Sequence, residues 1–417
     1  MKRTLALAAL TLALAVPTAH AQAKTEVTFW SWYLSPKFDG YLKDTIAAFE
    51  KENPTIKVNW FDKQDSMVQD FINSVNLGSA PDIVNLNIDE TAKAAQNGFL
   101  NSVDKLVSRS TLSTYYAQPL SNFASLGTHY GLPWYGWVNE GVLVYNPELL
   151  KKAGVTSVPK TMDQMIDAAR KIKTATGAYG WVPALKDPNS ASFLGFFNAE
   201  GLAITDSDGK AAFNSSAHVA LLQKYIDLYK GGFIPDDALR REAFQVATEL
   251  YAQGKVAMII GGPQALTRIK DNNKDLYAKT AVAVGPLGKA KIKTGGGMAL
   301  VLPKASKHPL EAAKFAAYMT NNANQMAFAK IVPIVPTTKA AQNDPFFKQT
   351  SDDPIAKATS LVGSQGRFIN PGNRAPTNSD DLYKNFSDNI EAAMLGKKSA
   401  QQALDDAATY WNANLKK

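Results

Sequence analysis

The 417-residue sequence contains no cysteine and only four histidines. Disulfide staples and thiolate metal sites are therefore excluded, and there is no thiol that could carry a lipid anchor. Three of the histidines, His129, His218 and His308, follow the N-terminal region, and each stands alone without the HExxH spacing of a zinc hydrolase. A chain of this length can bury a core large enough to do without disulfides, and it should divide into two lobes.

Long apolar runs are also scarce, and the clearest one lies at the N-terminus. Lys2 and Arg3 precede the apolar run from Leu5 to Val16, and Ala19, His20 and Ala21 form a small-x-small cleavage pattern. At about 1.5 Å per residue, this run is too short to cross the roughly 30 Å of bilayer hydrocarbon. We therefore expect residues 1–21 to be a signal peptide, and the remaining 396 residues to be exported, soluble and periplasmic or otherwise extracytoplasmic.

A dense basic block is missing as well, although the formal net charge is +8. The lysines and arginines are scattered singly, as in "DKLVSR" and "ARKIKT", rather than clustered as in nucleic-acid-binding arms. We expect a solvated charged surface and no nucleic-acid partner, with electrostatic affinity for acidic partners as the alternative.

Motifs for catalysis, metals and cofactors are absent too. "VGSQG" is not a GxSxG nucleophile elbow, because Ser364 directly follows Gly363. "DSDGK" fails as a calcium loop, because Lys210 takes a ligand position and no glutamate closes the loop. We predict no catalytic residue, no metal and no cofactor. A glycosidase needs only two carboxylates at a set distance, so a secreted carbohydrate-active enzyme stays open as the rival class.

Strand and helix patterns alternate along the chain. The apolar run "VTFWSW" is followed by "YLKDTIAAFEKENP", in which Leu42, Ile46 and Phe49 fall on one helical face. The strand "TIKVNWF", the helix "SMVQDFINSVNLG" and the buried strand "IVNLN" complete a βαβαβ unit, and a similar rhythm runs through the middle of the chain. This order predicts an α/β fold with sheets covered by helices, and ligands beyond the carboxyl ends of the strands.

The chain resembles the substrate-binding component of bacterial ABC importers, in the extracellular solute-binding group that includes maltose- and other sugar-binding proteins. The matching stretches run in order over nearly the whole mature chain: "VTFWSWY", "FEKENPTIKVNW", "GSAPDIVNLNIDE", "GFLNSVDKL", "YGLPWYGWVNEGVLVYNPELLKKAG", "VPKTMDQMIDAARKI", "FQVATELYAQGKVAMIIGGP", "GGGMALVLPKASKHPLEAAKFAAYMT" and "LGKKSAQQALDDA".

The resemblance implies a two-lobed periplasmic-binding-protein fold of type II. Each lobe would be a mixed, mostly parallel sheet flanked by helices, and hinge strands would join the lobes. We expect residues 22–137 plus 285–335 in the N-terminal lobe and 138–284 plus 336–417 in the C-terminal lobe. The implied function is capture of a mono- or oligosaccharide by a monomer that closes on it and delivers it to membrane permease subunits. Carriers of glycerol phosphate, polyamine or ferric iron remain alternatives.

Aromatic side chains should provide the apolar platforms of a sugar site, because a sugar ring has an apolar C–H face. Trp30 is expected in the core. Five aromatic residues are candidates for the cleft. Trp32 and Tyr33 follow the first expected strand, and the segment "LPWYGWVNEG" contains Trp134, Tyr135 and Trp137.

Planar polar side chains should satisfy the hydroxyl rim, because an unpaired buried hydroxyl costs about 1–3 kcal/mol. The candidates are Gln64, Asp65, Asn87, Asp89, Asn139, Glu140 and Arg374. Asp65 is equally suited to cap the next helix, and Arg374 to be an exposed loop charge. Gln264 stands where maltose binders carry a stacking aromatic, whereas Tyr383 keeps the ring at another such position. Gly296, with its neighbours Gly295 and Gly297, would let the ligand approach the backbone closely or would simply form a tight hinge turn.

Overall fold

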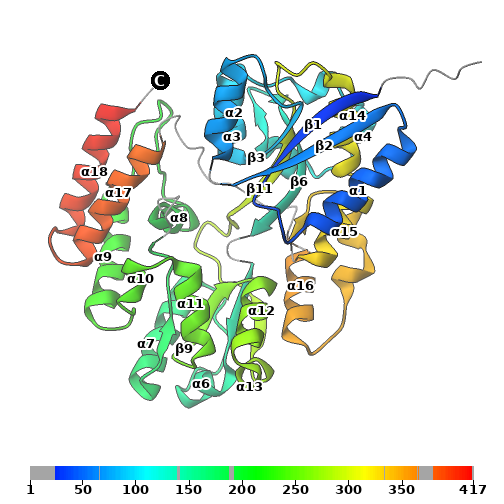
Figure 1. Ribbon diagram of the computed structural model, residues 1–417. Helices are drawn as coiled ribbons and strands as arrows, with labels where there is room; N and C mark the ends of the chain where they lie inside the picture. The colour runs from blue at the N-terminus through cyan, green and yellow to red at the C-terminus, as the bar shows by residue number, and fades with distance from the viewer. Residues whose placement is uncertain are drawn as a thin grey trace, which may run out of the picture.

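The computed structural model describes residues 24–64, 66–138, 141–186, 192–332, 334–363, 365 and 379–415. The signal peptide expected at residues 1–21 lies outside them. Two separate sheets, each flanked by helices, form two lobes (Figure 1). None of the helices in the described ranges is long and apolar enough to span a bilayer.

The first lobe is built on a six-stranded sheet whose strands come from distant parts of the chain. In spatial order these are β12 (Val335–Pro336), β6 (Gly131–Val138), β11 (Gly295–Val301), β3 (Ile83–Asn87), β1 (Thr25–Trp32) and β2 (Ile56–Lys63). β1 pairs in parallel with β2 and β3, and β11 runs antiparallel between β3 and β6. Because β12 also opposes β6, four strands point one way and two the other.

Helices cover both faces of this sheet. They are α1 (Asp39–Glu52), α2 (Met67–Asn76), α3 (Ile88–Gln96), η1 (Val103–Lys105), α4 (Arg109–Leu112), α5 (Ala117–Asn122), α14 (Pro309–Met319), α15 (Asn322–Ile331), η2 (Ala341–Asn343) and η3 (Pro345–Lys348), with a small hairpin of β4 (Ala124–Ser125) and β5 (Thr128–His129). As predicted, α1 buries Leu42, Ile46 and Phe49 and ends before Pro54.

The second lobe has a four-stranded sheet in the order β10 (Ala281–Val284), β7 (Val142–Tyr145), β9 (Val256–Gly261) and β8 (Tyr179–Trp181). Only β7 runs against the other three strands. Its helices are α6 (Pro147–Lys152), α7 (Met162–Thr176), α8 (Ser192–Ala199), α9 (Ser216–Lys230), α10 (Asp237–Arg240), α11 (Ala243–Ala252), α12 (Pro263–Asn272), α13 (Lys274–Ala278), α16 (Pro354–Gly363), α17 (Ser379–Met394) and α18 (Ala400–Asn414). The expectation of mixed sheets flanked by helices is confirmed in both lobes, but "mostly parallel" is wrong, because antiparallel strand pairs outnumber parallel ones by three to two in the first sheet and by two to one in the second.

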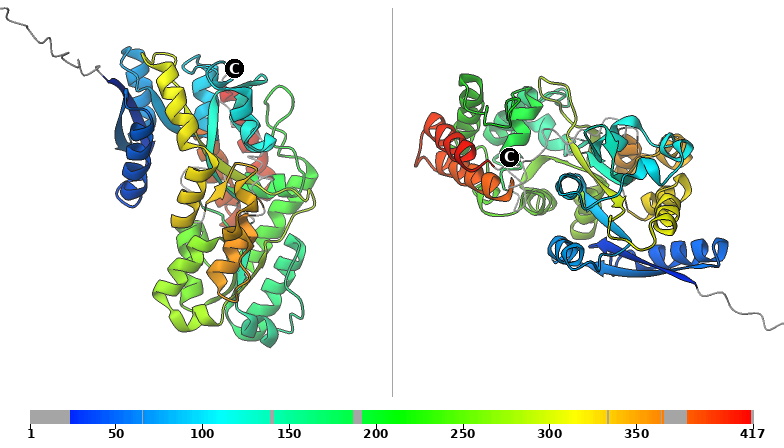
Figure 2. Two further views of the ribbon diagram at one scale, coloured as in Figure 1. Left: turned by 90° about the vertical axis from the view of Figure 1, so that its right-hand side faces the viewer. Right: turned by 90° about the horizontal axis from the view of Figure 1, so that it is seen from above.

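We propose that the division into lobes follows the expected segments except near residue 336. Thr337 donates a hydrogen bond to the carbonyl oxygen of Pro133 over 3.0 Å, and Ala341 and Phe347 belong to the hydrophobic cluster of the first lobe. We propose that the second lobe resumes at α16, which packs on α12 and β10. Figure 2 shows this part of the chain, from α14 to α16, descending from one lobe into the other.

Three segments meet where the lobes join. The backbone N–H of Gly285 donates to the carbonyl oxygen of Gly141 over 3.3 Å. Gln365, which is 4% exposed, donates to the same carbonyl over 3.0 Å, and its amide oxygen accepts from Lys293 over 2.6 Å. Gln365 therefore ties the β6–β7 connection to the β10–β11 connection.

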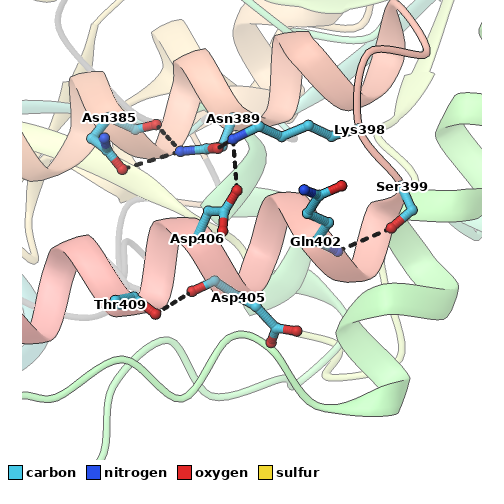
Figure 3. Close-up of polar contacts among 8 residues, drawn as sticks. All are labelled: Asn385, Asn389, Lys398, Ser399, Gln402, Asp405, Asp406 and Thr409. Carbon is cyan, nitrogen blue, oxygen red and sulfur yellow. Dashed lines mark hydrogen bonds and ion pairs between the residues drawn. The ribbon is translucent and has the colours of Figure 1, made fainter.

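The C-terminal helices α17 and α18 form an antiparallel hairpin at the outer side of the second lobe (Figure 1). Lys398, in the turn, donates to Asn389 of α17 and pairs with Asp406 of α18, both over 2.7 Å (Figure 3). Ser399 caps α18 by accepting from the N–H of Gln402 (Figure 3). These contacts fix the hairpin, which carries Tyr383 and Trp411 toward the junction of the lobes.

Candidate functional site

A cavity of about 770 Å³ lies between the two lobes. Tyr135, Gly136 and Trp137 of β6 line it from the first lobe, together with Asp89 in the first turn of α3. The second lobe contributes α8, the start of α11, the end of β9, the start of α12 and Tyr383 of α17. Small-molecule sites usually measure about 300–1,000 Å³, so this cavity has the size of a ligand site.

Partly exposed aromatic side chains come to the cavity from four elements. Trp137 is 42% exposed, and four further rings are half-buried: Tyr135, Phe196, Phe244 and Tyr383. Phe196 and Phe244 lie on α8 and α11, on the opposite side from β6. Aromatic rings from both lobes can therefore pack against the flat, apolar faces of a ligand.

Trp137 owes its position to the glycine opposite it on β11. Gly296 is the register partner of Trp137, and a Cβ at Gly296 would lie 2.2 Å from Cζ2 of the indole. The ring therefore rests on the backbone of Gly296. The space that this glycine leaves is filled by Trp137, and Gly296 itself does not border the cavity, which corrects the expectation that it admits the ligand.

The charge of the cavity is low and negative. Asp89 and Glu242 are the only charged side chains among the described residues that line it, and no lysine, arginine or histidine does so. Glu242 is engaged locally, since its carboxylate accepts from the backbone N–H groups of Phe244 and Gln245 at the start of α11. Burial and the nearby Asp62 raise the pKa of the Tyr135 hydroxyl, so it stays protonated and able to donate.

Five of the predicted site residues therefore line the cavity: Asp89, Tyr135, Trp137, Gln264 and Tyr383. Gln264 is exposed in the first turn of α12, and the ring of Tyr383 packs against Trp411 at 6.0 Å between centroids. Ligand contact by these five side chains stays a prediction.

Trp134 was expected in the cleft, and this is wrong. The ring is 0% exposed and packs beside Phe328 and Tyr41, which stack on each other in the core of the first lobe. Because side chains alternate along β6, the strand that turns Trp137 toward the cavity turns Trp134 inward, away from the ligand. The irregular appearance of the "LPWYGW" segment hid a regular strand.

Four other candidates lie apart from the cavity. Trp32 packs with Met67 and Phe71 beside β1, while Tyr33 is 52% exposed just after that strand. Gln64 is bonded to Asp62, and Asn87 accepts from the N–H of Glu90, capping α3. Asp65, Asn139, Glu140 and Arg374 fall outside the described residues.

Sequence reasoning missed the ring residues of α8 and α11, Phe196 and Phe244, and the carboxylate of Glu242. The run "SFLGFFNA" could have revealed a helix, but its continuous apolar pattern does not tell which ring faces the cavity. Within the described part of the chain, no group of three or more acidic or histidine side chains is placed to hold a metal ion.

Known proteins match this chain along most of its length. The family described as "Bacterial extracellular solute-binding protein" matches residues 34–326. A galactooligosaccharide-binding protein of Bacillus subtilis is 25% identical over 92% of this chain and 89% of its own, and the maltodextrin-binding protein MdxE of the same organism is 25% identical over 90% and 87%.

Solved structures agree with the architecture. A periplasmic-binding protein from Synechococcus sp. MITs9220 superposes with a TM-score of 0.82 and 26% identity, over 93% of this chain and 98% of its own. The expected two-lobed binding-protein fold is thus confirmed. With its lobes, its interlobe cavity and its matching profile, the chain belongs to the family of bacterial extracellular solute-binding proteins.

Proposed function

We propose that the protein is the extracytoplasmic receptor of an ABC importer and that it captures a neutral oligosaccharide in the cavity between its lobes. The observation that carries the proposal is the lining of this cavity. Aromatic rings border it from both lobes, and its described charged groups are carboxylates only. Carboxylates accept hydrogen bonds from sugar hydroxyls but repel a phosphate group, and no lysine or arginine among the described lining residues offsets that repulsion.

The number of aromatic rings favours more than one sugar ring. A single pyranose has two faces and can be held between two aromatic side chains. Five partly exposed rings, those of Tyr135, Trp137, Phe196, Phe244 and Tyr383, border the cavity. A ligand of two or more sugar rings can stack on several of these aromatic rings at once. The hydroxyl groups at the rim of the sugar then supply the selectivity.

Hinge closure follows from where the rings stand. A ligand that contacts Trp137 on one lobe and Phe196 or Phe244 on the other stabilises the closed arrangement, because it binds the two surfaces together only in that state. The three bonded segments around Gln365 are the site of the rotation. The closed receptor, acting as a monomer, would then dock on the permease and release an unmodified sugar.

The test is a thermal-shift panel on the mature chain, with neutral mono-, di- and trisaccharides, sn-glycerol 3-phosphate, spermidine and ferric citrate. A ligand at 100 times its dissociation constant adds about 2.7 kcal/mol, or roughly 5–10 °C in melting temperature for lobes of this size. We expect a neutral oligosaccharide to give this shift and to be recovered intact by chromatography.

Two variants test whether the ligand that raises the melting temperature binds in the cavity. Trp137→Ala should lose the shift, and Trp30→Ala, which removes a half-buried tryptophan outside the cavity, should keep it. A shift with sn-glycerol 3-phosphate alone would contradict the neutral ligand, and a cleaved sugar would mean that the protein is an enzyme.

A further inference from the structure

Two glycines of the second lobe line the cavity without an evident structural need for glycine. Gly195 lies in the middle of α8, and Gly262 precedes the first turn of α12. Glycine is required where φ is positive or where a Cβ would collide with a neighbour. Neither backbone has a positive φ, and a Cβ at either position would meet no described heavy atom within 4 Å beyond its own helix and chain neighbours.

Other glycines of this lobe do have such reasons. Gly177 ends α7 with a φ of 75°, in the left-handed region. A Cβ at Gly180 would lie 2.1 Å from Cα of Ala169, and one at Gly288 would lie 2.1 Å from the carbonyl oxygen of Ala199. Gly195 and Gly262 therefore stand out, because both line the cavity and neither has a described neighbour that requires glycine.

At both positions another residue would favour the fold. Glycine inside a helix is less stable than alanine, so the sequence forgoes stability at Gly195. Gly262 occupies the N-cap of α12 with φ −142° and ψ −170°, which any residue adopts, and no side chain caps that helix. Serine would suit this position, since its hydroxyl can accept from the first-turn N–H groups.

We propose that Gly195 and Gly262 determine ligand specificity: they keep two stretches of the cavity wall free of side chains, so that the oligosaccharide packs directly on the main chain of α8 and of the start of α12. Phe196, next to Gly195, lies at the same wall and offers a ring beside the bare backbone. The inference rests on the proposed function and adds to it where the second lobe contacts the sugar.

The experiment compares Gly195→Ala, Gly195→Met and Gly262→Ser with wild type. Two quantities are measured for each protein: the melting temperature without ligand, and the dissociation constant for the neutral oligosaccharide that gives the largest shift with wild type. Gly40→Ala is the matched control, because Gly40 is an exposed helical glycine on α1, has no described atom within 4 Å of an added Cβ and does not line the cavity.

The expected signature is higher stability with weaker binding. Gly195→Ala should raise the melting temperature of the free protein by about 2 °C and weaken sugar binding at least tenfold. Gly195→Met should weaken it further, because the longer side chain fills more of the cavity. Gly262→Ser should likewise keep or raise the melting temperature while weakening binding, and Gly40→Ala should bind as wild type does.

Two results would overturn the inference. If Gly195→Met and Gly262→Ser bind the sugar within twofold of wild type, no ligand lies against these walls. If Gly195→Ala melts below wild type, the glycine serves packing instead. The wild-type titration distinguishes failure of the proposed function from failure of this inference alone. A wild type that binds none of the sugars refutes the proposed function and, with it, this inference.

Discussion

The contact between Gly296 and the indole of Trp137 predicts that adding a single methyl group, in Gly296→Ala, displaces the ring. In Gly296→Ala the new Cβ would lie 2.2 Å from Cζ2 and 2.5 Å from Cε2 of the ring. Carbon atoms in contact stay about 3.5–4.0 Å apart, so the ring must move by roughly 1.3 Å or more. Because Trp137 is 42% exposed, the ring can swing into the cavity at small cost to the fold.

The displaced ring no longer offers its stacking surface in place. Losing a tryptophan anchor at a binding site costs about 2 kcal/mol or more, which corresponds to roughly a 30-fold rise in the dissociation constant. Isothermal titration with the oligosaccharide and a melting curve measure the two effects separately. We expect a large loss of affinity and a change in melting temperature of at most a few degrees.

Gly297→Ala is the control on the same strand. Its Cβ would lie 3.1 Å from the carbonyl oxygen of Tyr135, so neighbouring atoms need to move by only a few tenths of an ångström, and Trp137 is not among the nearest atoms. If Gly296→Ala kept wild-type affinity, or if Gly297→Ala lost as much, the positioning of Trp137 by Gly296 would be refuted.

Three further outcomes follow from buried groups. Trp134→Ala should lower the melting temperature by about 6–20 °C, because a fully buried tryptophan contributes about 3–5 kcal/mol, and a small change would contradict its core position. Gln365→Ala should lower it by about 2–8 °C, since three bonds of a buried amide are lost; unchanged melting would mean that they do not hold the hinge. Burial lowers the pKa of His218 below its usual 6.5, so the unfolded chain binds more protons and stability should fall as the pH drops from 7 to 5. Equilibrium unfolding at several pH values should show a smaller loss of stability in His218→Gln than in wild type. An equal dependence of the unfolding free energy on pH in the two proteins would refute this expectation.

Much of the fold could be predicted because its local signals agree. The helix at residues 162–176 begins after Thr161, which accepts from the N–H of Gln164, and it ends at the left-handed Gly177. Hydrophobic period, cap and terminator all indicate this helix. The contact of Thr337 with Pro133, on which our proposed lobe boundary depends, joins distant parts of the chain, and the sequence carries no local signal for it.

The site was predicted less well, because the sequence does not show in which direction each side chain points. An aromatic cluster such as Trp134, Tyr135 and Trp137 indicates that rings are near a cavity. Which of them faces it depends on strand register, which pairs Trp137 with Gly296. Asn87 was expected to bind ligand, but its position directly before α3 makes it the helix cap, a role that Ser, Thr, Asp and Asn commonly take.

One titration tests the central claim most directly: isothermal calorimetry of the mature protein with a neutral oligosaccharide, repeated with Trp137→Ala. The account predicts one sugar bound per wild-type chain and affinity at least tenfold weaker in the variant. Binding that Trp137→Ala leaves unchanged, or binding only of an anionic solute such as sn-glycerol 3-phosphate, would contradict it.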